Sequence, residues 1–260
     1  MSHMLVVIFW GLVGMAVGSF LNVVADRLPA GGSLLSPPSH CPHCGNRLRP
    51  TELVPVVSYL VLRGRCRSCD GPIGRRTLTV EAGTGLLFAM AAYRLPLVSL
   101  RGWLDLILLS SYLGVLVVTT VTDLEHGLIL NRVMYPALGI GAAGAVLAGW
   151  PEGVYRLAGG AIGAGVILLI LLLVPGGMGW GDLRLAGFVG LVTGLPGALF
   201  ALFVAFVIGG IVGGVLLASG RRRQGDTLPL GPFLALGGAV VLLYGDVLIR
   251  AFWALAAWVG

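Results

Sequence analysis

The stretch Leu5-Val-Val-Ile-Phe-Trp-Gly-Leu-Val-Gly-Met-Ala-Val-Gly-Ser-Phe-Leu-Asn-Val-Val-Ala25 contains no charged residue. A helix of roughly 20 residues crosses the hydrocarbon core of a bilayer, which is about 30 Å thick, so this stretch is long enough to span a membrane. It ends without a small-residue cleavage site, which favours a permanent span over a removable signal peptide. The first apolar run therefore predicts a membrane protein.

The rest of the chain has a similar composition. Of its 260 residues, 57% are hydrophobic and 11% are charged, whereas soluble domains carry about 25% charged residues. Apolar runs predict spans at 5–25, 79–96, 103–122, 127–149, 154–174, 183–195, 197–218 and 229–246. We therefore predict an all-α polytopic membrane protein with about eight transmembrane helices. A further interfacial helix is expected over 247–260, because Arg250 is followed by Trp253 and Trp258.

The basic residues predict the orientation of the chain. All 17 are arginines, and the net charge is +6. On the eight-span topology, thirteen lie on one side: Arg27, Arg47, Arg49, Arg63, Arg65, Arg67, Arg75, Arg76, Arg132, Arg184, Arg221, Arg222 and Arg223. Arg94, Arg101, Arg156 and Arg250 lie opposite. Cytosolic loops carry the positive excess, so the 26–78 segment is expected in the cytosol. Because the arginines cluster between apolar runs, lipid is the expected partner and nucleic acid is not.

All four cysteines lie in the 26–78 segment, as Cys41-Pro-His-Cys44 and Cys66-Arg-Ser-Cys69. Two C-x-x-C pairs separated by a loop are typical of a tetrahedral zinc site, in which each pair supplies two thiolates. Disulfides and a redox pair are the alternatives, but the cytosol is reducing. Four sulfurs close the shell and leave no position for water, so we expect structural Zn²⁺ with His43 as a neighbour.

Two aspartates lie at the predicted cytosolic border of the membrane. Asp123 ends the third predicted span, and Asp182 opens the sixth in Gly179-Trp-Gly181-Asp182. Two close carboxylates share a proton, so one is a base toward water and the other an acid toward a carbonyl. Gly179 and Gly181 permit unwound backbone beside a cavity and the approach of an extended peptide. Either aspartate alone would more often cap a helix or face solvent, but together they predict an aspartic protease.

Four other aspartates flank predicted spans without such a context: Asp26, Asp105, Asp226 and Asp246. We expect these to reach water. The cysteine segment would present Glu52 and its arginines at the cytosolic mouth of the helices.

The order of these motifs resembles the type IV prepilin peptidases, the leader peptidases of type IV pili and type II secretion. The resemblance covers nearly the whole chain. It is carried by Gly18-Ser-Phe-Leu-Asn22-Val-Val-Ala-Asp-Arg27-Leu-Pro29, the two cysteine pairs, Pro55-Val-Val-Ser58-Tyr59-Leu, Leu62-Arg-Gly64-Arg-Cys66, Asp123-Leu, Gly179-Trp-Gly181-Asp182 and Leu228-Pro-Leu-Gly231-Pro232-Phe.

The resemblance implies that Asp123 and Asp182 are the catalytic pair, flanked by the active-site glycines Gly179 and Gly181. It implies cleavage of a basic leader from prepilins or pseudopilins at the cytosolic face of the bacterial inner membrane. It further implies N-methylation of the new N-terminus with S-adenosylmethionine, to which Glu52 is assigned. The expected division is a first transmembrane helix (1–25), a cytosolic zinc-binding domain (26–78) and a transmembrane protease domain (79–260).

This sequence departs from the family pattern at a few positions. Arg184 stands where a lysine is common, Ile129-Leu130-Asn131 lacks the usual proline, and Thr51 and Thr77 replace usual aromatic residues. Residues two apart do not face each other on a helix, so Arg184 is expected to meet headgroups more than Asp182. Three other hypotheses remain: a presenilin-like protease cutting within membrane helices, a transporter using the aspartates as a proton relay, and a non-catalytic assembly factor.

Overall fold

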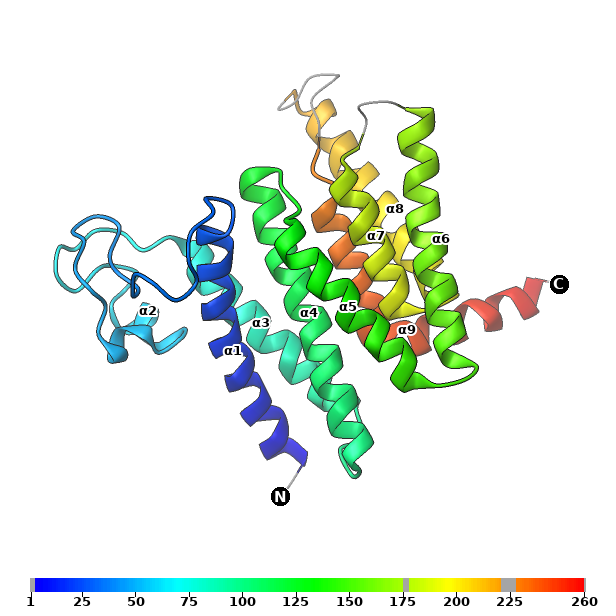
Figure 1. Ribbon diagram of the computed structural model, residues 1–260, viewed down its shortest axis with the longest axis horizontal. Helices are drawn as coiled ribbons and strands as arrows, with labels where there is room; N and C mark the ends of the chain where they lie inside the picture. Colours follow the sequence, from blue (N-terminus) through cyan, green and yellow to red (C-terminus); the bar gives the residue numbers. More distant parts are fainter. Residues whose placement is uncertain (1–2, 175–177, 221–227, 260) are drawn as a thin grey trace. The chain divides into compact units, whose positions relative to one another are not determined.

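A computed structural model describes residues 3–174, 178–220 and 228–259. Its chain divides into two compact units, Met1–Val118 and Thr119–Gly260. Each unit is described by itself. All regular elements among the described residues are helices, which confirms the predicted all-α class (Figure 1).

The first unit consists of three helical segments, and a long loop connects the first two of them. These are α1 (His3–Arg27), α3 (Arg75–Arg94) and the first part of α4 (Leu100–His126). Helix α1 packs directly on α3, and a Cβ at Gly14 would lie 2.9 Å from the Cα of Gly85. Such glycine contacts let helix backbones approach closely in a lipid environment, where packing replaces the hydrophobic effect. The indole N–H of Trp10 donates to Ser110 on α4 at 2.8 Å.

The loop between α1 and α3 contains two short helices, η1 (Pro50–Leu53) and α2 (Val57–Val61). Pro50 begins η1, as expected for a residue without a backbone N–H to satisfy. Isolated antiparallel bridges join His40 to Arg47 and Arg65 to Pro72. We call residues 39–73 the cysteine module.

The second unit surrounds α7 (Trp180–Thr193), whose residues from Leu185 to Val192 are all buried. It packs among α5 (Asn131–Ala148), α6 (Glu152–Leu173), α8 (Gly197–Ala218) and α9 (Gly231–Val259). The tightest crossing joins α6 to α7, where a Cβ at Gly159 would collide with the backbone of Gly190. The end of α4 and the starts of α5, α7 and α9 carry the polar residues described below.

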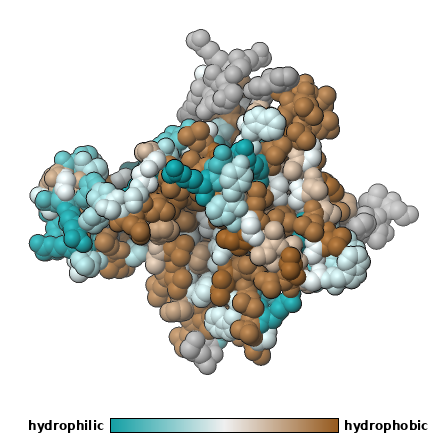
Figure 2. Space-filling view, viewed as in Figure 1, coloured by the Kyte–Doolittle hydropathy of each residue, from teal (hydrophilic) through white to brown (hydrophobic). Residues whose placement is uncertain are grey.

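The eight main helices lie at the eight predicted ranges. By the length and composition of these helices, however, fewer than eight could each cross a membrane. Among the described residues, five helices are long and apolar enough to cross a membrane: α1, α4, α6, α8 and residues Gly231–Phe252 of α9. Helix α7 has only 14 residues, and α3 carries three arginines and Glu81 within its 20 residues. Helix α5 has 18 residues and begins with Asn131 and Arg132. Figure 2 shows hydrophobic surface over much of the visible helices.

The helix predicted at 247–260 is not separate from the last predicted span. Residues 247–259 continue α9 without a break, because neither proline nor glycine occurs among them. Arg250 pairs with Asp246 one turn earlier at 2.7 Å. The side chains of Trp253 and Trp258 lie outside the described part of the chain, as do Arg221–Arg223 and Asp226.

Candidate functional site

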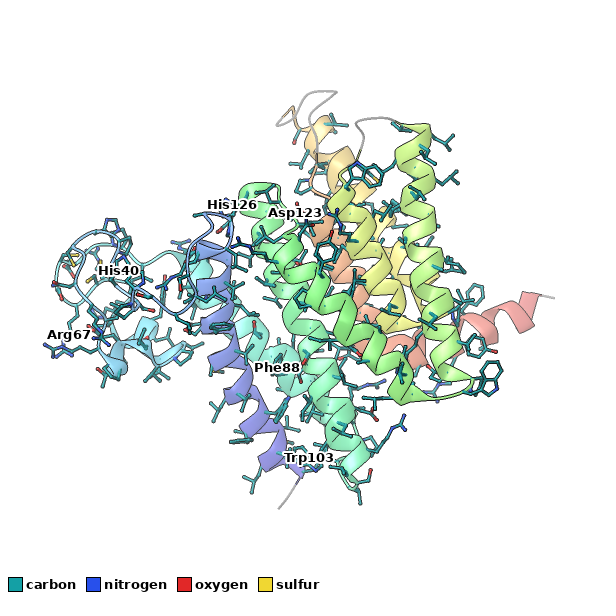
Figure 3. The ribbon with its side chains drawn as sticks, in the orientation of Figure 1. His40, Arg67, Phe88, Trp103, Asp123 and His126 are labelled. Carbon is teal, nitrogen blue, oxygen red and sulfur yellow. The ribbon has the colours of Figure 1, made fainter. Side chains whose placement is uncertain are left out.

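Asp123 is a buried carboxylate near the end of α4 (Figure 3). Its Oδ2 accepts a hydrogen bond from the backbone N–H of Gly231 at 3.0 Å. Gly231 is the first residue of α9, so the carboxylate lies at a helix N-terminus, where unsatisfied N–H groups favour negative charge. A Cβ at Gly231 would collide with the carboxylate of Asp123. The contact therefore requires glycine at this position.

Asp182 lies in the first turn of α7 and is half-buried. Its Oδ2 accepts from the N–H of Gly179 at 2.9 Å, and its own N–H donates to the carbonyl of Gly179 at 3.0 Å. This is the helix-capping arrangement that a lone aspartate often adopts. Because only Oδ2 is used, Oδ1 has no hydrogen-bond partner among the described residues.

The structure brings the two aspartates together. Asp123 and Asp182 lie close enough for their carboxylates to repel each other electrostatically. No ion pair from a described arginine neutralises either one. The other membrane-flanking carboxylates differ: Asp105 lies 3.8 Å from Arg101, and Asp26 lies 2.6 Å from Arg76. A carboxylate pair without a cation is the arrangement that shares a proton.

The two predicted glycines have different surroundings. A Cβ at Gly181 would lie 2.7 Å from the Cβ of Ile129, so α7 begins in close contact with the loop that follows Asp123. A Cβ at Gly179 would make only an ordinary contact, at 3.5 Å from Oδ2 of Asp182. Gly181 therefore allows the two aspartate-bearing segments to pack against each other, whereas the space around Gly179 does not itself require glycine.

Arg184 does not pair with Asp182. Its Nη1 donates to Oδ1 of Asn131 at 2.7 Å, and its guanidinium lies 5.7 Å from the centre of the Tyr135 ring. Both partners lie on α5. The arginine thus joins the starts of α5 and α7 beside the carboxylates, an arrangement that sequence spacing alone could not supply.

The four cysteines form one cluster within the first unit. Their Sγ atoms all lie within 4.8 Å of one another, and those of Cys41 and Cys69 are 3.8 Å apart. Tetrahedral zinc with Zn–S bonds of about 2.3 Å requires sulfurs about 3.8 Å apart. The donor set and its spacing therefore fit a thiolate metal site.

Each cysteine pair lies in the same backbone turn. The N–H of Cys41 donates to the carbonyl of Asn46 at 2.9 Å, and the N–H of Cys66 donates to that of Gly71 at 2.8 Å. The residues four positions after the first cysteine of each pair, Gly45 and Asp70, both have a left-handed φ, of 72° and 59°. Two equivalent turns present four sulfurs to one point, as a structural zinc site needs.

The surroundings of the thiols follow from this geometry. N–H groups of Cys44 and His43 lower the pKa of Cys41 to about 6. An N–H of Gly71 lowers the pKa of Cys69, but lost hydration and the neighbouring thiols outweigh it and raise that pKa to about 12. His43 is not one of the clustered ligands, and its Nε2 lies 3.3 Å from the carbonyl of Pro72.

Glu52 and Glu81 both hold backbone groups of the cysteine module. Oε2 of Glu52 accepts from the N–H of Arg49 at 2.7 Å, which caps η1. Oε2 of Glu81 accepts from the N–H of Val56 at 2.6 Å, and Glu81 is buried. Val56 has a φ of 62°, which is strained for a β-branched residue. This role of Glu81 is not among the predictions from the sequence, although an acidic residue within the apolar run at 79–96 is a usable signal.

The fold and site define a class: an integral membrane protein with a thiolate metal-type site and two adjacent carboxylates that no described arginine neutralises. Comparison with known proteins is more specific. A model described as the bacterial peptidase A24 N-terminal domain matches residues 12–95, and one described as the type IV leader peptidase family matches residues 110–214.

Several relatives are similar over nearly their whole length. The chain is 31% identical to the prepilin leader peptidase/N-methyltransferase of Bacillus subtilis, over 93% of this chain and 95% of the relative. The chain is also 34% identical to the protein of the same name from Burkholderia pseudomallei, over 90% of this chain and 84% of the relative. It is 32% identical to that of Aeromonas hydrophila, over 96% of each. No solved structure matches the chain. The chain belongs to the type IV leader peptidase family, which confirms the resemblance found in the sequence.

Proposed function

We propose that this chain is a membrane aspartic endopeptidase that removes the leader peptide of type IV prepilins or pseudopilins. The observation that carries the proposal is the approach of Asp123 and Asp182 without a neutralising cation among the described residues. The names of its relatives, prepilin leader peptidase/N-methyltransferase, support the same substrate class.

The reaction uses the two carboxylates in different protonation states. The ionised aspartate accepts a proton from water, whose oxygen attacks the scissile carbonyl, while the protonated aspartate donates to the carbonyl oxygen. When the C–N bond breaks, the aspartate that took the proton from water gives it to the leaving amine, and the former carbonyl oxygen returns its proton to the other aspartate. Each carboxylate accepts one backbone N–H, Asp123 from Gly231 and Asp182 from Gly179, so either aspartate can act as the base while its partner carries the shared proton.

The second proposed activity is N-methylation of the amine that cleavage exposes. S-adenosylmethionine would supply the methyl group as a second substrate. We propose Glu52 for this step. Its carboxylate lies in η1, where Oε2 accepts a hydrogen bond from the N–H of Arg49. The thiolate cluster would hold Zn²⁺ through Cys41, Cys44, Cys66 and Cys69, with a structural role.

We propose that the chain lies in the bacterial inner membrane with residues 26–78 and the aspartates facing the cytosol. The eight arginines within residues 26–78 support this orientation, and this number does not depend on how many later helices span the membrane. On this proposal, residues 26–78 form the zinc-binding domain, residues 79–260 form the protease domain, and pilus assembly and type II secretion are the processes served.

The test is to incubate the purified chain in detergent with a full-length prepilin and weigh both products. We expect a single cut directly after the basic leader, before the hydrophobic helix. Cuts within that helix would support a presenilin-like protease instead. An intact prepilin under conditions in which a known relative cleaves it would reject the peptidase assignment.

A further inference from the structure

The cysteine module presents an apolar surface that no described residue covers. Val57, Leu60 and Val61 lie on one side of α2, at positions i, i+3 and i+4. Their exposed fractions are 55%, 61% and 75%. Leu53 and Val54 precede them and are also exposed. We call these five residues the α2 apolar face. Figure 2 shows hydrophobic residues beside hydrophilic ones on the visible side of this module.

Arginines flank the α2 apolar face along the sequence. Arg49 immediately precedes η1, Arg63 follows α2 by two residues, and both are exposed. Arg67, also exposed, projects outward from the module (Figure 3). Apolar side chains flanked by arginines match the boundary of an anionic bilayer, where the aliphatic parts enter lipid and the guanidinium groups reach phosphates.

The hydrogen bond from Val56 to Glu81 fixes the depth of this segment. The start of α3 carries Arg75 and Arg76, and Arg76 pairs with Asp26 near the end of α1 at 2.6 Å. These charged helix ends mark the headgroup layer. Glu81 lies five residues further along α3 than Arg76, about 7.5 Å, and packs against Gly18 of α1, a helix long enough to cross a membrane. The residue that precedes α2 is therefore held at the depth where interfacial helices bury their apolar side, about 5–10 Å.

We infer that the α2 apolar face lies in the anionic headgroup layer of the membrane in which the chain is embedded. The module would then be held at three points: the end of α1, the start of α3 and the α2 apolar face. Because α1 and α3 tether the module to the same membrane, even a five-residue helix meets lipid at a high effective concentration. This inference stands independently of the peptidase activity.

The test uses the full-length, zinc-loaded chain, one copy per nanodisc, and hydrogen–deuterium exchange of the peptide that covers residues 49–63. In discs that contain phosphatidylglycerol, these amides should exchange several-fold more slowly than in detergent, because lipid covers them. In phosphatidylcholine discs the protection should be smaller. Replacing Arg49→Gln or Arg63→Gln should each weaken the phosphatidylglycerol effect about fivefold, the contribution of one arginine at an anionic surface.

A double variant, Leu60→Asp with Val61→Asp, should abolish the protection. Leu35→Asp is the matched control, because Leu35 is 92% exposed in the same loop but outside the face. The zinc content of each variant reports whether the module remains folded. Equal exchange in discs and detergent would overturn the inference. Protection that appears only when prepilin is added would also overturn it and would assign the face to the substrate.

Discussion

The Asp123 carboxylate accepts a hydrogen bond from the N–H of Gly231, 108 residues further along the chain. Replacing Gly231→Ala would force a Cβ into the carboxylate and displace it. Displacement by about 1 Å can lower a rate by about 10²-fold, so we expect leader cleavage to fall by about that factor. Gly210→Ala is the control, because nothing lies within 4 Å of a Cβ there. Equal rates for the two variants in a prepilin cleavage assay would contradict the positioning role.

The two aspartates should be needed together. Asp123→Asn or Asp182→Asn removes one member of the proton-sharing pair, and each should lower the cleavage rate by about 10²–10⁴-fold. Amounts of inserted protein should stay unchanged, which immunoblotting of membranes measures. Asp105→Asn is the matched control, because Asp105 is an exposed partner of Arg101. A single variant that keeps near-normal cleavage would remove that aspartate from the mechanism.

The cysteine cluster should hold about one zinc per chain. Zinc must displace protons from thiols such as Cys69, whose pKa is raised to about 12. Zinc affinity should therefore weaken as the pH falls, and loading should release protons. Metal analysis and titration with a competing chelator measure both effects. The double variant Cys41→Ser with Cys44→Ser should lose the metal. If the unaltered chain, prepared without a chelator, contains no zinc, the site is refuted.

Glu81 should stabilise the cysteine module through the N–H of Val56. Glu81→Ala would leave that N–H without its acceptor, at a cost of about 1–3 kcal/mol in folding free energy. Glu81→Gln keeps an acceptor oxygen and should cost less. The two variants can be compared by their rates of limited proteolysis between α1 and α3 and by their thermal denaturation temperatures in detergent. If Ala and Gln variants resist proteolysis equally, the hydrogen bond does not hold the module.

Methylation should follow cleavage, because the amine exists only after the cut. Prepilin incubated with the chain and isotopically labelled S-adenosylmethionine should yield a mature product heavier by one methyl group. Glu52→Ala should reduce methylation more than cleavage. A cleaved, unmethylated product would leave the peptidase intact and remove the second activity. Label on the uncleaved precursor would reverse the proposed order.

Several features could be predicted because they depend on local sequence. Hydropathy located all eight long helices, since apolar runs of suitable length identify helices wherever they pack. The two C-x-x-C pairs predicted the sulfur cluster, because each turn presents its cysteines through bonds within six residues. The paired context of Asp123 and Asp182 predicted their approach, and the order of motifs predicted the family.

Other features depend on contacts between distant residues. Nothing near Arg184 indicated that it would bind Asn131, which lies 53 residues earlier. The roles of Gly231 and Glu81 likewise depend on partners 108 and 25 residues away. The predicted number of spans was wrong for another reason. A helix buried among its neighbours, such as α7, can be apolar without being long enough to cross a bilayer.

The shortness of α7 has a consequence for the supply of water. Its 14 residues extend about 21 Å, and a hydrocarbon core is about 30 Å thick. Helix α7 packs closely along α6, a helix long enough to cross. If the far end of α7 reaches the opposite surface, its first turn lies about 9 Å below the near surface. At that depth Asp182 would lie below the membrane surface, and we expect the hydrolytic water to reach it from the side on which α7 begins.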